Sequence, residues 1–220
     1  MSSVFSPELS AKITRTGIVA VIVLESENHV APLADALREG GVNAVELALR
    51  TPRSLEALRV LRRHAPEMLV GAGTVLLPEQ VARVREAGAD FAVAPGTNRR
   101  VLEAAAGVDL PFGPGIVTPS DIEAALEFGC NVLKFFPAEP SGGLKYLRNM
   151  IAPYQHLGLR YIPLGGLAAD NISPYAADPN VLAIGGSWIA PKVLIEAEDW
   201  TEITARARVA VDTVKQNRQS

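Results

Sequence analysis

Short apolar runs alternate with segments of helical period along the whole chain, and this alternation limits the possible folds more than any other feature. The runs predicted to be strands are Ile18–Leu24, Ala44–Leu49, Leu69–Thr74, Phe91–Pro95, Phe112–Val117, Val132–Phe136, Arg160–Leu164 and Leu182–Gly185. Segments with helical period between them include Asn28–Glu39, Ser54–His64, Glu79–Glu86, Arg99–Ala105 and Ser120–Phe128. Several of these follow cap-like residues and end in glycine, as in Gly41, Gly88 and Gly129. The pattern predicts an α/β fold with a parallel sheet.

The chain has 220 residues, of which 48% are hydrophobic and 20% charged, so it can bury one large core. Eight strands alternating with helices favour a (β/α)8 TIM barrel over an open doubly wound sheet. No Gly-x-Gly-x-x-Gly follows the first strand, as a dinucleotide-binding fold would require. We predict a single domain over residues 1–220, with an N-terminal helix before the first strand. The barrel is expected at about 17–200 and a polar, frayed tail at about 215–220.

Charge and composition exclude several classes of partner. The net charge of −3 gives no reason to expect nucleic acid, and no apolar run approaches the length of a membrane span. The segment from Met1 to Lys12 lacks the apolar region of a secretion signal, and the single cysteine, Cys130, cannot form an internal disulfide. We therefore predict a cytoplasmic protein. The three histidines have no metal-ligand spacing, so no metal is predicted.

Lys134 is the one lysine set inside an apolar strand, in the run Asn131–Pro137. Burial of an ammonium without a partner is costly, so a lysine in such a place usually has a function. A desolvated amine favours its neutral form, which can attack a carbonyl and form a Schiff base. The alternative is a lysine that extends out of the strand end or pairs with a carboxylate for structural reasons.

Strand parity relates Lys134 to a carboxylate. Side chains alternate with period two, so Glu46 and Arg50 share a face of the second strand, and Lys134 and Phe136 share a face of the sixth. If both faces point inward, Glu46 and Lys134 meet across the barrel. A carboxylate beside a Schiff-base lysine is what proton transfer at the neighbouring carbon requires. The alternative is an interior ion pair with no catalytic role.

Further candidates lie at the expected carboxyl ends of the strands, where TIM barrels build their active sites. Arg50 offers a guanidinium suited to a carboxylate or a phosphate, or else forms a salt bridge at the rim. Thr74 follows Gly71-Ala72-Gly73, where missing side chains would leave room for a ligand; alternatively it caps the next helix.

Glycine pairs end the last two strands, at Gly165-Gly166 and at Gly185-Gly186, and Ser187 follows the second pair. Loops in these positions of a barrel often bind phosphate through backbone N–H groups. Either pair alone is a weak signal because glycine also serves tight turns. Together, in the two expected places, they predict a phosphorylated substrate.

These residues resemble the 2-keto-3-deoxy-6-phosphogluconate (KDPG) aldolase family, which also acts on 4-hydroxy-2-oxoglutarate (KHG). The resemblance covers about Gly17 to Trp200. The matching segments are Val45–Thr51, Val70–Val75, Ala94–Gly96, Pro114–Thr118, Lys134–Glu139 and Gly185–Trp188, among which Lys-Phe-Phe-Pro-Ala-Glu is quite specific.

The resemblance implies a class I aldolase on a TIM barrel, assembled as a homotrimer, with no metal or organic cofactor. It implies that Lys134 forms the Schiff base and that Glu46 moves protons. It further implies that Arg50 and Thr74 hold the pyruvyl carboxylate and that Pro95 and Phe136 line the pocket. The Gly165-Gly166 and Gly186-Ser187 regions would bind the phosphate.

One position departs from the family pattern. This chain has Pro163-Leu164-Gly165-Gly166 where the 6-phosphogluconate-type enzymes have Pro-Thr-Gly-Gly. Because Leu164 has no hydroxyl, selectivity for the configuration at C4 is open. The expected reaction is reversible cleavage of a phosphorylated 2-keto-3-deoxy sugar acid to pyruvate and glyceraldehyde 3-phosphate. Alternatives are a main activity on KHG or oxaloacetate, or a non-catalytic barrel that binds sugar phosphates.

Overall fold

The computed structural model describes residues 4–218 and contains parallel strands alternating with helices. The strands are β1 (Ile18–Ile22), β2 (Ala44–Ala48), β3 (Leu69–Gly73), β4 (Phe91–Val93), β5 (Phe112–Gly113), β6 (Gly115–Ile116), β7 (Val132–Phe135), β8 (Arg160–Pro163) and β9 (Ile184–Gly186). The helices are α1 (Pro7–Thr16), α2 (Val30–Glu39), α3 (Ser54–His64), α4 (Pro78–Glu86), α5 (Arg99–Gly107), α6 (Pro119–Leu126), α7 (Gly143–Ile151), α8 (Ser173–Ala176), α9 (Lys192–Glu196) and α10 (Trp200–Arg218), with 3₁₀ turns η1 (Glu27–His29) and η2 (Ala152–Leu157).

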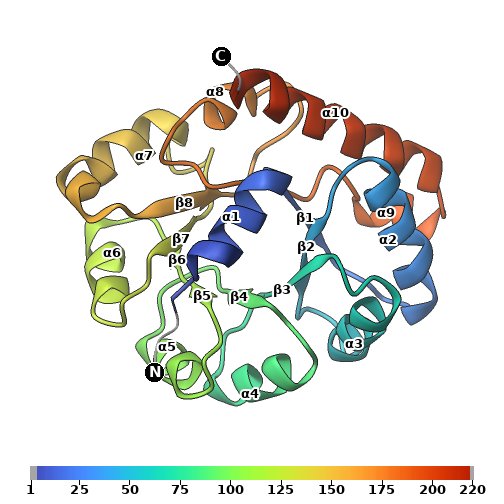
Figure 1. Ribbon diagram of the computed structural model, residues 1–220, viewed down its shortest axis with the longest axis horizontal. Coiled ribbons are helices and arrows are strands. Elements are labelled where there is room, and N and C mark those ends of the chain that lie inside the picture. Colours follow the sequence, from blue (N-terminus) through green and yellow to red (C-terminus); the bar gives the residue numbers. More distant parts are fainter. Residues whose placement is uncertain (1–3, 219–220) are drawn as a thin grey trace.

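All strand pairs are parallel, and they form a curled sheet with helices on its outer side (Figure 1). The hydrogen-bonded ladder is divided into a six-stranded sheet, β5-β4-β3-β2-β1-β9, and a three-stranded sheet, β6-β7-β8. This α/β architecture agrees with the prediction from the alternating pattern, and each predicted strand overlaps an observed one.

Two differences at strand level have local causes. The predicted strand Phe112–Val117 is divided into β5 and β6 at Pro114, which has no N–H to donate to a ladder. Its carbonyl still accepts from Lys134 N at 2.9 Å, so the chain stays beside β7. The predicted strand Leu182–Gly185 corresponds to β9, which begins two residues later, at Ile184. Before β9, an isolated bridge pairs Val181 with Tyr161.

Helix ends follow the residues expected from the sequence. Gly41, Gly88 and Gly129 follow α2, α4 and α6 with φ of 88°, 93° and 71°, a left-handed conformation that glycine adopts without steric cost. Thr118 caps α6, and its side chain and that of Asp121 form a capping box. After each of these helix ends the chain turns back toward the start of the next strand.

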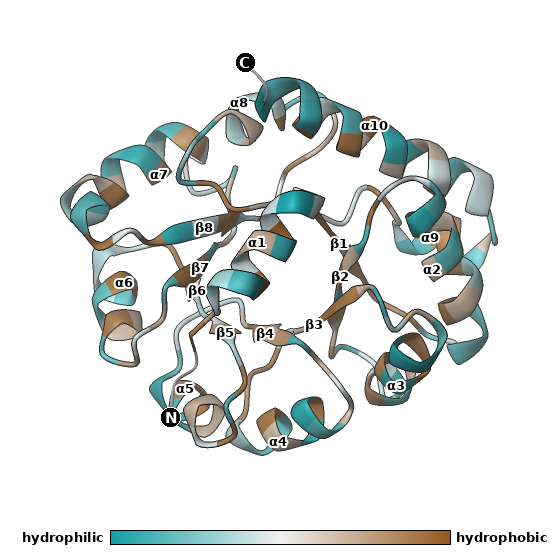
Figure 2. Ribbon diagram, in the orientation of Figure 1, coloured by the Kyte–Doolittle hydropathy of each residue, from teal (hydrophilic) through white to brown (hydrophobic). Residues whose placement is uncertain are grey.

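The core has two layers, as the alternation of side chains along the strands requires. Outward-facing residues such as Val45 and Leu47 pack under the helices. Inward-facing residues such as Ala44 and Val132 pack inside the curled sheet together with Phe5 and with Ile13 of α1. The strands are brown over much of their length, although β8 begins teal, and the surrounding helices alternate brown and teal along their turns (Figure 2).

Helix α1 lies across one end of the curled sheet in Figure 1, which leaves the carboxyl ends of the strands free at the opposite end. Helix α10 packs on the outside with Ala207, Val211 and Val214 buried. It continues to Arg218, which donates to the carbonyls of Thr14 and Leu182. The expectation of a frayed tail is therefore wrong for residues 215–218, because these contacts extend the helix; residues 219–220 lie outside the described part.

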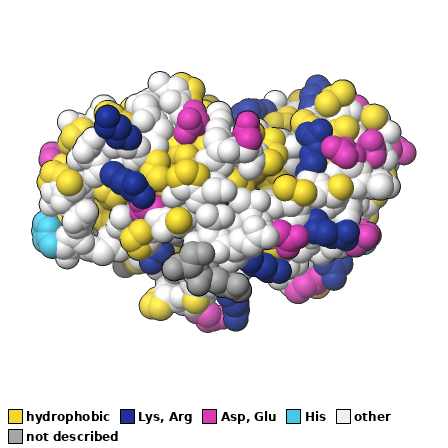
Figure 3. Space-filling model, turned by 90° about the horizontal axis from the view of Figure 1, so that it is seen from above, with side chains coloured by type: hydrophobic (Ala, Val, Ile, Leu, Met, Phe, Trp, Pro, Cys, Tyr) yellow, Lys and Arg dark blue, Asp and Glu magenta, His cyan; other side chains and the backbone are white. Residues whose placement is uncertain are grey.

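Positive and negative side chains are interspersed on the face seen in Figure 3. In the part of the chain that the structure describes, no helix combines the length and the apolar character needed to cross a bilayer.

Candidate active site

Lys134 and Glu46 meet inside the curled sheet, as strand parity predicted. Lys134 Nζ donates to Glu46 Oε1 at 2.8 Å, and the two side chains are only 5% and 4% exposed. Lys134 lies near the carboxyl end of β7 and Glu46 in the middle of β2, and the two strands belong to different sheets. The Phe136 ring lies 5.5 Å from Nζ, close enough for a cation–π contact. The arrangement places an amine, a carboxylate that can exchange a proton with it, and an aromatic wall in one buried space.

The two glycines of β3 make room for neighbouring side chains, one of which is Glu46. A Cβ on Gly73 would lie 2.1 Å from Glu46 Oε1, and one on Gly71 would lie 2.3 Å from the Phe91 ring. The expectation that Gly71-Ala72-Gly73 leaves room for a ligand is therefore wrong for both glycines, because protein side chains occupy the space. The sequence pattern did not predict that Gly73 leaves space for the Glu46 carboxylate, because a glycine at this position does not indicate which side chain fills the space beside it.

Arg50 and Thr74 lie together just beyond the ends of β2 and β3. Arg50 Nε donates to Thr74 Oγ1 at 3.2 Å. The alternative that Thr74 caps α4 is wrong, because the cap position of that helix is Leu77. Thr74 has φ of 59°, an outlier for a β-branched residue that persists only where the surroundings impose it. Such strain is typical of functional sites.

Pro95 and Phe136 follow the ends of β4 and β7. Pro95 is exposed and Phe136 is half-buried. A Cβ on Gly115 would lie 2.2 Å from the Pro95 carbonyl, so the chain after β4 packs closely on the bend between β5 and β6. Both predicted pocket residues are thus at the same end of the sheet as Lys134.

The Gly165-Gly166 segment presents backbone N–H groups without protein acceptors. The carbonyls of Leu164, Gly165 and Gly166 accept from Ala138 N at 2.8 Å, Glu139 N at 3.0 Å and Asn171 Nδ2 at 3.0 Å. The N–H groups of Gly165, Gly166 and Leu167 have no acceptor within residues 4–218. Successive N–H groups left free in this way suit an anion.

The remaining predicted residues lie beside this segment. Gly186 ends β9, and a Cβ there would lie 2.2 Å from the Trp188 ring; Ser187 is exposed directly after it. Leu164 is 7% exposed, and its Cδ1 lies 2.3 Å from where a Cβ on Gly185 would be. Leu164 therefore forms an apolar wall over β9 and offers no hydrogen bond there.

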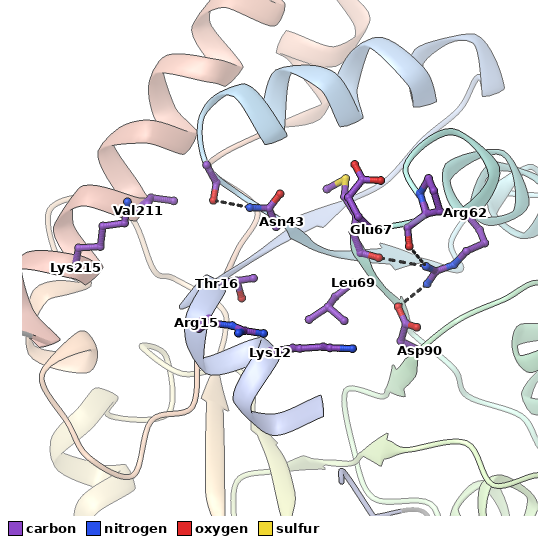
Figure 4. Close-up of a pocket in the computed structure, with 13 residues that line it drawn as sticks. Lys12, Arg15, Thr16, Asn43, Arg62, Glu67, Leu69, Asp90, Val211 and Lys215 are labelled. Carbon is purple, nitrogen blue, oxygen red and sulfur yellow. Dashed lines mark hydrogen bonds and ion pairs between the residues drawn. The ribbon is translucent and has the colours of Figure 1, made fainter. Parts of the chain in front are cut away.

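A pocket of about 630 Å³ lies at the other end of the sheet and contains none of the predicted site residues (Figure 4). Several of its charged groups already bind other groups of the protein. Arg62 donates to Asp90 and to the carbonyls of Pro66 and Met68, and Glu67 binds Arg38 at 2.6 Å. Because these groups are already paired, we do not assign the chemistry to this pocket.

Among the described residues, no group of three or more His, Cys, Asp or Glu side chains is arranged to hold a metal ion. Cys130 is buried two residues before the start of β7.

The sequence and the fold match known aldolases. A profile of the family "KDPG and KHG aldolase" matches residues 9–206. The chain is 39% identical to 2-dehydro-3-deoxy-phosphogluconate aldolase of Haemophilus influenzae over 94% of this chain and 97% of that protein. It is 42% identical to the KHG/KDPG aldolase of Escherichia coli K12, over 92% and 94%.

Among solved structures, the KDPG aldolase of Legionella pneumophila, with pyruvate captured as a covalent carbinolamine intermediate, superposes with a TM-score of 0.87. That structure is 35% identical, and the match covers 94% of this chain and 98% of that one. The chain therefore belongs to the KDPG and KHG aldolase family.

Proposed function

We propose that the protein is a class I aldolase, a lyase that reversibly cleaves 2-keto-3-deoxy-6-phosphogluconate, or its C4 epimer, to pyruvate and glyceraldehyde 3-phosphate. The observation that carries the proposal is the buried contact of 2.8 Å between Lys134 Nζ and Glu46 Oε1. An amine in such a place can lose its proton to the carboxylate and attack a carbonyl.

In the proposed mechanism, Lys134 Nζ attacks the C2 ketone, and loss of water from the carbinolamine gives a protonated imine. Glu46 takes the proton of the C4 hydroxyl, directly or through water. The C3–C4 bond then breaks, its electrons pass into the imine to form an enamine, and the aldehyde leaves. Glu46 returns the proton to C3, and hydrolysis of the imine releases pyruvate and the free amine.

Two sets of groups would hold the ends of the substrate. Arg50 and Thr74 are proposed to bind the carboxylate, since the guanidinium and the hydroxyl are already aligned with each other at 3.2 Å. The free N–H groups of Gly165 and Gly166, with the Gly186-Ser187 segment, are proposed to bind the phosphate. Pro95, Phe136 and Leu164 would line the space between the two ends.

KHG is a second candidate substrate, because the family profile covers both activities and the Escherichia coli relative bears both names. KHG has no phosphate. Comparison of catalytic efficiency on the two substrates separates a phosphate-dependent enzyme from one that acts mainly on KHG or oxaloacetate. A single-turnover assay with either substrate tests the remaining alternative, a non-catalytic sugar-phosphate-binding barrel.

We further propose that the two sheets form one closed (β/α)8 barrel within a single domain. Support comes from both junctions: β5 and β6 are separated only by Pro114, and Leu182 N donates to Tyr161 O at 2.8 Å beside β9. A homotrimer, which the family resemblance implies, is supported by the adjacent exposed side chains of Leu76 and Leu77, at 46% and 50% exposure. Analytical ultracentrifugation tests the trimer. A cytoplasmic location stays a prediction.

Borohydride reduction in the presence of pyruvate tests the Schiff base. The expected result is one added pyruvyl unit, located at Lys134 by peptide mapping and absent from Lys134→Ala. Lys145 and Lys192 serve as internal controls, since Lys145 lies on a surface helix and Lys192 binds Glu25 at 3.0 Å. Label on either of these instead, or full activity in Lys134→Ala, would contradict the proposal.

A further inference from the structure

The Gly165-Gly166 segment is held by two side chains that the mechanism does not use, those of Glu139 and Tyr175. We propose that Glu139 and Tyr175 are positioning residues, which fix the phosphate-binding segment relative to Lys134. The inference rests on the proposed function, because it takes the free N–H groups of Gly165 and Gly166 to bind the substrate phosphate.

A hydrogen bond joins the segments that follow β7 and β8. Tyr175, in α8, is only 2% exposed, and its hydroxyl donates to Glu139 Oε1. Burial and the neighbouring Glu139 carboxylate both raise the pKa of Tyr175 well above its usual range, because both disfavour the phenolate. The hydroxyl therefore remains a donor at every pH at which an enzyme of this kind would be assayed.

Glu139 contacts the glycine segment directly. Its backbone N–H donates to Gly165 O at 3.0 Å, and a Cβ on Gly166 would lie 2.7 Å from Glu139 Cβ. Gly166 thus packs against the Cβ of Glu139, while Tyr175 hydrogen-bonds to the carboxylate at the end of the same side chain. Movement of the Glu139 side chain would be transmitted to Gly166 because no side chain lies between them.

The backbone between Lys134 and Glu139 connects this support to the reacting amine. Glu139 follows Lys134 in the run Lys134–Glu139, so one stretch of chain carries the amine and supports the phosphate segment. Neither Glu139 nor Tyr175 hydrogen-bonds to Lys134 or Glu46. Loss of the Tyr175–Glu139 bond should therefore loosen the phosphate end and leave the chemistry at Lys134 intact.

The test is steady-state kinetics of Tyr175→Phe and Glu139→Ala on two substrates, KDPG and unphosphorylated KHG. The KM for KDPG should rise about tenfold, as expected when one hydrogen bond to a charged group no longer supports a binding segment. The kcat for KDPG and the efficiency on KHG should change less than threefold. Glu139→Gln still accepts from Tyr175 and should stay close to the wild type. The double variant should raise the KM for KDPG no further than the more impaired of the two single variants does, because both substitutions remove the same hydrogen bond.

Tyr154→Phe is a matched control, because Tyr154 donates to Glu123 at 2.9 Å between η2 and α6, away from the glycine segment. It should leave both KM values unchanged. Equal losses on KDPG and KHG would mean a merely structural role, and an unchanged KM for KDPG would overturn the inference. If Tyr175→Phe does not fold, Glu139→Ala decides the question, because Glu139 is exposed and its substitution leaves the core intact. If the wild type shows the same catalytic efficiency on KDPG as on unphosphorylated KHG, that result would instead contradict the proposed function.

Discussion

Substitution of Gly73 by alanine should lower the rate of the enzyme although it removes none of the reacting groups. The added Cβ would lie 2.1 Å from Glu46 Oε1 and 2.7 Å from both Cδ and Cγ, whereas ordinary contact begins at 3.4 Å. The difference between 3.4 and 2.1 Å requires the carboxylate oxygen to retreat by about 1.3 Å. A misplacement of about 1 Å costs on the order of 10²-fold in rate. We therefore expect kcat to fall about 10²-fold, equivalent to about 2.7 kcal/mol in the barrier.

The assay is cleavage of KDPG coupled to a pyruvate readout, with borohydride trapping of pyruvate as a measure of Schiff-base formation. Gly96→Ala is the matched control, because a Cβ there would meet nothing within 4 Å. Circular dichroism and thermal unfolding check that Gly73→Ala folds. If folded Gly73→Ala retains kcat within threefold of the wild type, the position of Glu46 does not limit the reaction, and the reasoning is refuted.

Other variants test the acid–base group, the stereochemical wall and a structural ion pair. Glu46→Gln should keep the fold and lose about 10²–10⁴-fold in kcat, since glutamine cannot carry a proton; a loss below tenfold would leave Glu46 only an ion-pairing role. Leu164→Thr should widen the ratio of efficiencies for the two C4 epimers in favour of the gluconate type, because a hydrogen-bonding site discriminates more than an apolar wall; an unchanged ratio contradicts this. Burial alone would raise the pKa of Asp178, but hydrogen bonds from Arg148 and Asn180 outweigh it and hold that pKa below its usual range. The resulting stability is present above the unfolded pKa and lost as pH falls, so Arg148→Met should cost about 2 kcal/mol in urea unfolding at pH 7 and little in strong acid.

The order of strands and helices was predictable because it depends on local patterns. Period-two alternation identified which side of β2 and β7 faces inward, and glycines after helices marked where the chain returns. From these patterns alone, Glu46 and Lys134 could be expected to meet, and the hydrogen bond of 2.8 Å between them in the structure confirms that they do. The end of α10 was not predictable, because Arg218 is held by carbonyls of Thr14 and Leu182, far away in the sequence.

The amino-acid sequence by itself determined that this chain is an α/β protein with an amine and a carboxylate on inward strand faces, because those features depend only on residue type and on periods of two and 3.6. The tertiary structure decided what fills the space beside each glycine. Gly73 admits a carboxylate from residue 46, and Gly166 rests on a side chain held by Tyr175. Such contacts depend on the register of neighbouring strands and on loop packing, which join residues that are distant in the chain and leave no periodic signal in it.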